Sequence, residues 1–393
     1  MSKPKIRFKG YEDDWEQRKL GDISSLITKG TTPKDKSGTG EVNFIKVENI
    51  NDFSGDIVGM SKISLEEHQG YLKRSQLQEG DILFSIAGTL GRVTSVNKEI
   101  LPANTNQALS IIRLKEGNLE YVKTCLKGNV VADFIRRNPT IGAQPNLSLE
   151  QVSNLEIEIP SEAEQEKIGL YFSNLDHLIT LHQRKCEETK KLKKYMLQKM
   201  FPQNGKRVPE IRFAGFTDDW EQRKLGDVTE LKSASRVHKG EWTDSGVPFF
   251  RSSDVMAAIN GTTNEKAYIS EELYEKLSNA SGKLEEGDVL VTGGGSVGNP
   301  YIVPNNEPLY TKDADLLWIK NQGRFYPYFL YEYFFSPTFR IYLSNISHVG
   351  TIAHYTITQL SETPISLPDI EEQIKVGEYF ESLDRLITLH QCK

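Results

Sequence analysis

The sequence predicts an α+β protein that contains two copies of one unit, and two internal echoes lead to this fold class. Residues Ile6–Asp22 (IRFKGYEDDWEQRKLGD) return as Ile211–Asp227 (IRFAGFTDDWEQRKLGD), and 14 of 18 positions are identical between 6–23 and 211–228. A second echo joins Ile159–Lys185 to Leu367–Lys393, with 16 of 27 positions identical. The long segments between the echoes are far less alike. Because repeats fix the architecture of a chain, we expect two similar frames that carry two different inserts.

The composition is that of an ordinary globular protein of two domains. The chain has 393 residues, of which 26% are charged, and its net charge is −6. This acidic balance argues against a protein that coats nucleic acid by bulk electrostatics, but it leaves room for a local basic cleft. Cys125, Cys186 and Cys392 form no C-x-x-C pair. We therefore expect neither a disulfide framework nor a zinc ribbon, and the opening MSKPKIRFKG shows no signal peptide, so the cytoplasm is the expected location.

Strand-like runs bounded by Gly, Asn and Asp occur in each globular part, and they predict mixed, mainly antiparallel sheets. In the first copy these runs are Val42–Val47, Asp81–Ile86 and Ala108–Leu114. Their counterparts in the second copy are Val247–Arg251, Asp288–Thr292 and Asp315–Ile319. A helical stretch and then a last strand follow in each copy, at Tyr121–Arg137 and Leu155–Ile159, and at Tyr326–Leu343 and Pro364–Leu367.

A long helix is predicted to close each copy. Between Ser161 and Met200 there is no proline and only one glycine, Gly169. Apolar residues recur there at alternating steps of four and three, which is the seam of a coiled coil. About 40 residues would make a rod of roughly 60 Å. We expect the two helices to pack antiparallel about a pseudo-two-fold axis, with the seam residues Phe172, Leu175, Ile179 and His182 in the first and Phe380, Leu383, Ile387 and His390 in the second.

These patterns divide the chain into five segments. They are a first globular part (1–160), a long central helix (161–200), a connector (201–210), a second globular part (211–368) and a shorter helix (369–393). The first helix continues about 16 residues beyond Lys185, whereas the sequence stops at Lys393, the aligned position of the second. Either the second helix is short or the sequence is cut.

The glycine-rich segment Gly293–Gly298 has the G-x-G-x-x-G spacing of a dinucleotide site. Such a site needs a helix directly afterwards to hold the pyrophosphate, and NPYIVPNNEP cannot start one. We therefore predict a tight turn between strands. A glycine loop that approaches a phosphate is the alternative, and Arg92, beside the equivalent loop of the first copy, would fit that use.

Other motifs favour structural roles. Asn299-Pro300-Tyr301 is similar to part of the catalytic tetrapeptide of adenine methyltransferases, but no cofactor motif precedes it, so we interpret it as a coincidence. The seven histidines show no metal-ligand spacing. The acidic pairs in Asp13-Asp14-Trp15-Glu16 and Asp218-Asp219-Trp220-Glu221 predict a structural clasp or a docking surface for a partner rather than a catalytic pair.

Polar and basic side chains gather on the divergent inserts at matched positions, and such groups hold phosphates and read base edges. Solvated loops are the plainer interpretation of any single residue among them. The candidates for contact with DNA are Lys29, Thr31, Thr32, Lys34, Lys46, Asn49, Arg92, Asn106, Gln107, Arg136, Arg137, Gln144, Ser233, Ser235, Arg236, Lys239, Arg251, Ser252, Ser253, Lys312, His348, His354 and Tyr355.

Taken together, the chain resembles the specificity (S) subunit of type I restriction–modification enzymes over essentially its whole length. The resemblance is carried by the WEQRKLGD openings, by GDILFSIAGTLGRV and GDVLVTGGGSVGNP at Gly80–Val93 and Gly287–Pro300, and by the helices EQEKIGLYFSNLDHLITLHQ and EEQIKVGEYFESLDRLITLHQ. It implies two target-recognition domains, each reading one half of a bipartite, asymmetric DNA sequence, separated by two long helices that set the distance between the halves.

The resemblance also implies that the chemistry belongs to partners. Two modification subunits would bring S-adenosylmethionine for DNA methylation, and two restriction subunits would bring ATP and Mg²⁺ for translocation and cleavage. We expect no catalytic, cofactor or metal site in this chain. Contacts between the helices or with partners are expected from the seam residues given above and from Trp15 and Trp220.

Two rival hypotheses come from other classes. A self-sufficient adenine methyltransferase would transfer methyl groups without partners. A structural adaptor would assemble with partners and show no sequence preference.

Overall fold

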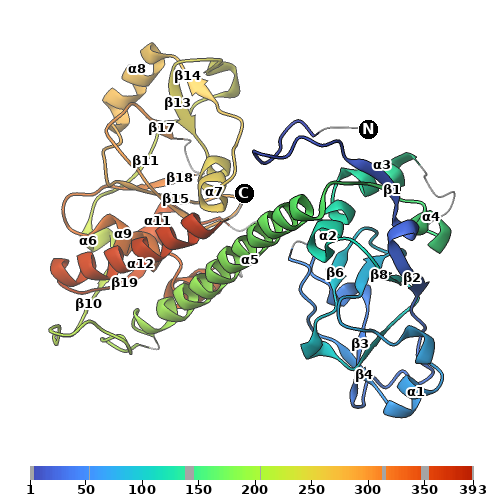
Figure 1. Cartoon of the computed structure of the whole chain (residues 1–393). Coiled ribbons are helices and arrows are strands. Elements are labelled where there is room, and N and C mark those ends of the chain that lie inside the picture. The colour runs from blue at the N-terminus through green and yellow to red at the C-terminus, as the bar shows by residue number, and fades with distance from the viewer. Residues whose placement is uncertain are drawn as a thin grey trace. The chain divides into compact units, whose positions relative to one another are not determined.

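The computed structural model describes residues 4–52, 54–137, 146–203, 205–311, 316–346 and 354–391. These residues form two compact units, the first extending to Gln183 and the second covering Arg184–Gln391. The helix α5, Glu162–Lys199, belongs to both units, since the boundary falls within it (Figure 1). A continuous helix over this segment confirms the long central helix predicted from its composition.

Unit 1 is built on two small sheets and one two-stranded ribbon. The antiparallel sheet has the order β2 (Ser24–Lys29), β8 (Leu109–Leu114), β5 (Ile82–Ser85) and β6 (Val93–Ser95). The other sheet has the order β4 (Ser61–Ile63), β3 (Val42–Ile45) and β7 (Ala103–Thr105), with β3 and β7 parallel. The ribbon pairs β1 (Glu16–Lys19) with β9 (Glu156–Ile159), so the opening motif is tied to the last strand of the unit.

Unit 2 repeats this topology. Its antiparallel sheet has the order β11 (Leu231–Ser233), β18 (Leu316–Ile319), β15 (Val289–Thr292) and β16 (Pro300–Ile302). The mixed sheet has the order β12 (Trp242–Thr243), β14 (Tyr268–Ile269), β13 (Val247–Phe250) and β17 (Tyr310–Thr311), with β13 and β17 parallel. The ribbon pairs β10 (Glu221–Lys224) with β19 (Pro364–Leu367). The predicted mixed, mainly antiparallel pairing is confirmed.

Short helices connect the strands. Unit 1 contains α1 (Leu65–Gln69), α2 (Leu119–Lys127), α3 (Asn129–Arg137), α4 (Leu149–Ser153) and the 3₁₀ turns η1 (Leu20–Ile23), η2 (Val47–Asn49), η3 (Lys73–Ser75) and η4 (Lys98–Ile100). Unit 2 contains α6 (Leu225–Val228), α7 (Ser252–Asn260), α8 (Glu271–Ser281), α9 (Pro327–Tyr333), α10 (Pro337–Ile346), α11 (Ile357–Ser361), α12 (Ile370–His390) and η5 (Lys239–Glu241). The single helices predicted at 121–137 and 326–343 are each two helices, because Gly128 caps α2 and Pro337 begins α10.

The central strands of both units are buried on both faces. In β5, Ile82 and Phe84 pack into one cluster, and Leu83 packs into another on the opposite face. In β15, Val289 and Val291 lie on one side and Leu290 on the other. This is the period of two expected of a strand, and it explains why Ile82–Phe84 and Val289–Val291 are apolar throughout.

One glycine in each copy allows the closing helix to lie against another helix of its unit, α5 against α2 and α12 against α9. A Cβ atom on Gly169 of α5 would lie 2.8 Å from both Asn118 Oδ1 and Tyr121 N. A Cβ atom on Gly377 of α12 would lie 2.5 Å from the Tyr326 ring. Glycine is thus required in both copies, because any side chain would push the helices apart.

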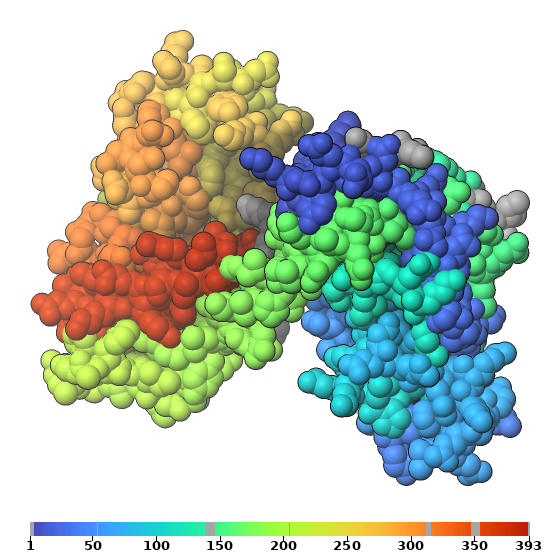
Figure 2. Space-filling view, in the orientation of Figure 1, coloured from blue at the N-terminus to red at the C-terminus, as the bar shows by residue number. Residues whose placement is uncertain are grey.

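Within unit 2, α12 packs antiparallel to the C-terminal half of α5. Cys186 Sγ lies 3.8 Å from Ile387 O, Lys193 binds Asp384, and the Phe201 ring stacks on Phe380, so residue numbers rise on one helix as they fall on the other. Figure 2 shows α12 (red) directly against this yellow-green part of the chain. The expected antiparallel helix pair is therefore present within this unit.

The seam residues differ between the copies. Phe380 and Leu383 are buried, as predicted. Their counterparts Phe172 and Leu175 remain 44% and 36% exposed, and Ile179 is 38% exposed. The prediction that the first set is buried along its length is wrong for the described residues, since α5 contacts its neighbours there through Ile168, Gly169 and Asp176 instead.

Candidate nucleic-acid interface

Several predicted residues of unit 1 meet at the loop that follows β2. Thr31 N donates to Thr105 O at 2.9 Å, and the Thr32 hydroxyl bonds the side-chain oxygen of Gln107. The Arg74 guanidinium, which the sequence did not single out, lies 3.4 Å from the Thr31 hydroxyl. Residues far apart in the sequence are thus gathered into one polar, exposed surface.

A groove of about 250 Å³ adjoins this surface. Three lysines line it, Lys36, Lys46 and Lys62, against one acid, Asp35, and Thr32 and Asn106 complete its polar rim. The acid is engaged with Ser37, whose hydrogen bonds lower the pKa of the Asp35 carboxyl. The groove is therefore a local basic site on an acidic chain, and it holds three of the predicted contacts, Thr32, Lys46 and Asn106.

Unit 2 presents a related surface at the equivalent strand end. Lys46 N bonds Asn49 Oδ1 at 2.8 Å directly after β3, and Arg251 N bonds Asp254 Oδ2 at 2.9 Å directly after β13, so the two basic residues occupy matched positions. The Arg251 guanidinium lies 5.6 Å from the Trp242 ring centre and bonds Asp254 and Glu265 O. In place of the lysines of unit 1, this copy has an arginine that lies over an indole and whose guanidinium is already held by Asp254 and Glu265 O.

The remaining candidates differ in their exposure. Ser252 and Ser253 begin α7, and Lys34 Nζ lies 4.6 Å from the centre of the Tyr71 ring. Ser235 is half-buried, and its carbonyl accepts a hydrogen bond from the Tyr310 hydroxyl. Exposed side chains are also found at Lys29, Arg136, Arg137, Ser233, Arg236, Lys239 and His354. Gln144, Lys312 and His348 lie outside the described residues.

Three candidates have structural roles, which corrects the prediction for them. Asn49 is buried and its amide donates to Val58 O and Gly59 O. Tyr355 is 1% exposed and its hydroxyl bonds Thr363. The Arg92 guanidinium donates to Val47 O and Ile50 O and pairs with Asp52. The donors and acceptors of these side chains are used in holding loops together.

The two glycine loops have the same hydrogen bonds. Ser85 Oγ donates to Thr89 O and accepts from Arg92 N, and Thr292 Oγ1 donates to Ser296 O and accepts from Asn299 N. Each loop leads into a strand, β6 or β16, and not into a helix. The predicted turn between strands is confirmed, and the helix N-terminus that a dinucleotide site requires is absent at these loops.

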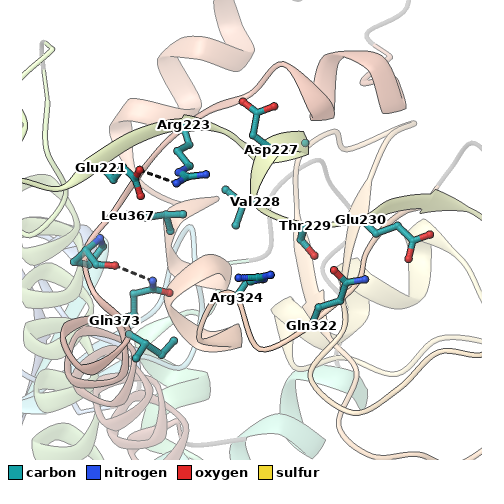
Figure 3. Close-up of a pocket in the computed structure, with 13 residues that line it drawn as sticks. Glu221, Arg223, Asp227, Val228, Thr229, Glu230, Gln322, Arg324, Leu367 and Gln373 are labelled. Atoms are coloured by element: carbon teal, nitrogen blue, oxygen red, sulfur yellow. Dashed lines mark hydrogen bonds and ion pairs between the residues drawn. The ribbon is translucent and has the colours of Figure 1, made fainter.

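A second groove, of about 660 Å³, lies in the frame of unit 2 (Figure 3). Charged side chains of both signs line it, among them Glu221, Arg223, Asp227 and Arg324, and Arg223 pairs with Glu221 at 2.7 Å. Glu16, Arg18 and Asp22 repeat three of these residues in the first copy. In unit 1 Arg18 pairs with Glu116 instead, so the copies share these residues in sequence and not the groove itself. Residues common to both copies cannot distinguish two DNA sequences, so we assign base recognition to the inserts.

The comparisons with known proteins agree with this arrangement. The family model described as "Type I restriction modification DNA specificity domain" matches twice, at residues 12–191 and 217–393. The chain belongs to this family. It is 24% identical to the type I restriction enzyme MjaVIII specificity subunit of Methanocaldococcus jannaschii, over 96% of this chain and 88% of that one. It is 29% identical to the EcoBI specificity subunit of Escherichia coli, over 40% of this chain and 34% of that one.

Solved structures give the same fold. The S subunit of a type I restriction–modification system from M. genitalium superposes with a TM-score of 0.63 at 13% identity, covering 99% of this chain and 94% of that one. As a type I specificity subunit, the protein is a recognition component and not itself an enzyme. No helix in the described part of the chain is both long and apolar enough to cross a membrane.

The residues expected at interfaces have varied surroundings in this specificity subunit. Trp220 is buried in the core of unit 2, where its indole N–H donates to Glu372, so the expectation of an interface position for Trp220 is corrected. Trp15 is half-buried beside Tyr121. Ile387, His182 and His390 are half-buried, and both histidines have interaction partners.

Sequence reasoning missed a buried polar network in unit 2. Lys193 Nζ lies 2.7 Å from Glu332 Oε1 and 2.6 Å from Asp384 Oδ1, and the Tyr328 hydroxyl donates to Asp384. Burial raises the pKa of Glu332 to about 8, although the positive charge of Lys193 acts to lower it. The sequence could have indicated this network, because Lys193 and Asp384 carry opposite charges and lie on two helices that were predicted to pair.

Proposed function

We propose that this specificity subunit reads a bipartite, asymmetric DNA target, with one half-site read by each unit. One observation carries the proposal: the two units share their frame and topology, yet matched strand ends carry different polar surfaces. Two copies of one recognition surface would favour a symmetric target, whereas unlike surfaces on like frames favour an asymmetric one.

Different side chains of these surfaces suit the phosphates and the bases of DNA. Exposed lysines such as Lys36 and Lys62 suit phosphates, which fix the position of a protein on the duplex. Thr32 and Gln107 carry the hydroxyl and amide groups that bond base edges in the major groove. The net charge of −6 predicts weak binding by the isolated chain, so partner subunits would supply much of the phosphate neutralisation.

The proposal extends to scaffolding in the cytoplasm. Two modification subunits would bind S-adenosylmethionine and methylate adenine, and two restriction subunits would bind ATP and Mg²⁺. The frame groove at Glu221, Arg223 and Asp227, repeated in sequence at Glu16, Arg18 and Asp22, supports this role because identical partners require identical docking surfaces.

An exchange of one insert tests the proposal. Residues 24–158 would be replaced by the corresponding segment of another specificity subunit, and methylated adenines would be mapped across the genome of cells that also carry the partners. We expect a change confined to one half-site. A change in both halves, or methylation without sequence preference, would contradict it. Methyl transfer by the purified chain alone would restore the enzyme hypothesis.

A further inference from the structure

A side chain of the short helix α1 holds the loop that borders the basic groove of unit 1. Glu67 Oε1 accepts hydrogen bonds from Lys34 N at 2.7 Å and from Asp35 N at 3.3 Å. The other oxygen, Glu67 Oε2, is buried and has no hydrogen-bond partner among the described residues. A carboxylate is a strong acceptor for backbone N–H groups. The bonds therefore tie the loop to a helix residue that lies 33 positions after Lys34 in the chain.

This loop carries groups that the proposed function assigns to DNA. Thr32, Asp35 and Lys36 line the groove of about 250 Å³. The loop leaves β2 at Thr31, whose backbone N–H donates to the last residue of β7 at 2.9 Å. Beyond that bond, Glu67 fixes the backbone N–H groups of two further loop residues. The positions of the threonine and lysine side chains in the groove therefore depend on this carboxylate.

Unit 2 has a leucine in place of this glutamate. The helices α1 and α8 follow the matched strands β4 and β14. Each begins after a serine whose hydroxyl accepts a hydrogen bond from the third residue of the helix, Ser64 from Glu67 N and Ser270 from Leu273 N. Leu273 packs against a buried apolar cluster. An apolar residue therefore suffices for the helix at this position, and the bonds to the loop are what the glutamate adds in unit 1.

The corresponding loop of unit 2 is held in another way. There His238 N donates to Glu241 Oε2 at 2.7 Å, so the donor and the acceptor belong to the same loop. An acid in the first turn of a helix is favourable in itself, and this accounts for Glu66 of α1 equally well. The bonds to the loop distinguish Glu67 from this neighbour.

The charge of Glu67 opposes DNA binding. DNA phosphates repel a nearby carboxylate, and the affinity for DNA rises when such a charge is removed. A loop that is already ordered, however, loses less conformational entropy when it binds. The two effects on affinity have opposite signs, so a measurement of DNA binding can separate them.

We propose that Glu67 is a positioning residue for DNA recognition by unit 1. It fixes the loop through Lys34 N and Asp35 N before DNA binds, so that Thr32 and Lys36 reach the duplex in a single arrangement. Glu67 acts through the backbone of the loop and does not itself contact DNA. The inference rests on the proposed function, because the loop is taken to lie at the DNA interface.

Three substitutions in the full chain separate position from charge. Glu67→Ala removes the two bonds and the charge, whereas Glu67→Gln removes the charge and keeps an oxygen that can accept the bonds. Glu66→Ala is the matched control, because Glu66 is an exposed acid on the same helix. We expect Glu67→Ala to weaken DNA binding by about tenfold, which corresponds to the ordering of about one backbone residue. The other two variants should bind DNA as tightly as the parent or more tightly.

DNA affinity would be measured with the assembled complex and a duplex that carries the sequence methylated by the parent. Hydrogen exchange of the segment 32–36 supplies a readout that does not involve DNA. Exchange should be faster in Glu67→Ala and unchanged in Glu67→Gln and Glu66→Ala. Should Glu67→Ala lower the melting temperature, Glu67→Leu takes its place, because leucine supports the matched helix of unit 2.

Three results would overturn the proposal. They are DNA binding by Glu67→Ala as tight as that by Glu66→Ala, equal weakening in Glu67→Ala and Glu67→Gln, and weaker binding with unchanged exchange of the segment 32–36. Lys36→Ala separates these failures from failure of the proposed function. If Lys36→Ala weakens binding and Glu67→Ala does not, the groove contacts DNA and the positioning role alone is wrong. If neither variant weakens binding, the groove does not contact DNA, and the proposed function fails at this unit.

Discussion

Arg212 holds Glu372 through two hydrogen bonds of 2.7 Å, and Arg7 holds Glu164 in the same way in the other copy. Each arginine comes from the start of an echo, and each glutamate is buried in the first turn of a closing helix. The pair therefore fastens the opening segment of a unit to its last helix, and it does so in both copies.

Removal of Arg212 should destabilise unit 2 strongly. Arg212→Ala leaves the Glu372 carboxylate buried and without its cation, and a loss of this kind costs about 3–5 kcal/mol. Urea unfolding followed by tryptophan fluorescence would measure it. Arg223→Ala is the control, because Arg223 pairs with Glu221 at the surface, and no measurable change is expected. Equal losses in both variants would contradict the buried clasp.

Gly377→Ala should separate α12 from α9. The added methyl group would lie 2.5 Å from the Tyr326 ring and 3.0 Å from Phe329 N, which requires backbone movement, and overpacking of this kind costs about 1–3 kcal/mol. Gly240→Ala provides the control, since a methyl group at that position would have no atom within 4 Å. A thermal melt that falls only for Gly377→Ala is expected, and equal melting of both variants would refute the close approach.

The stability of unit 2 should depend on pH through Glu332. Its pKa in the folded protein is raised from 4.5 to about 8. The folded state therefore binds this proton more tightly than the unfolded chain, and stability decreases as pH rises from about 4.5 to about 8, by at most about 1.4 kcal/mol per pH unit. Above this range the contribution is constant.

Glu332→Gln removes this titration. Urea midpoints at pH 5 and pH 8 should differ less in this variant than in the parent chain. Glu286→Gln, at an exposed position, should keep the parent's difference. An unchanged pH dependence in Glu332→Gln would show that other groups cause it.

Lys36→Ala should weaken DNA binding to a similar extent on all sequences. Lys36 lines the basic groove of unit 1, and loss of one phosphate contact reduces the slope of log affinity against log salt by about 1. Titrations with the assembled complex at several salt concentrations would measure the slope. Lys115→Ala is the control, because Lys115 is exposed and its backbone N–H bonds Ile23 O in the frame. If the slope of log affinity against log salt decreased in Lys115→Ala and not in Lys36→Ala, the DNA interface would not lie at this groove.

Four residues inserted between Gln183 and Arg184 should lengthen the unread spacer of the DNA target. This point in α5 is the boundary between the units and precedes Cys186, whose thiol lies 3.8 Å from Ile387 O of α12. One added helical turn extends α5 by about 6 Å, or one to two base pairs at about 3.4 Å each. Mapping of methylated adenines would give the new spacer, and an unchanged spacer would contradict the role of α5 as a ruler.

Much of the fold was predictable because repeats constrain it. The two echoes placed the frame, and the apolar runs Ile82–Phe84 and Val289–Val291 predicted β5 and β15, since central strands buried on both faces are apolar throughout. The break at Gly128 was missed because the hydrophobic period continues from α2 into α3. The candidate site was predicted only in part: residue type suggested both Asn49 and Lys46, and only tertiary contacts distinguish a buried cap from an exposed lysine.

The sequence by itself determined that this protein has two like frames, a long central helix and two unlike inserts, because identity at a fixed offset and apolar periodicity are properties of the linear chain. The tertiary structure alone decided which polar side chains are exposed and which are buried in holding loops together, as Asn49 and Tyr355 are. The physical reason is that burial, hydrogen-bond satisfaction and cavities depend on neighbours from distant parts of the chain.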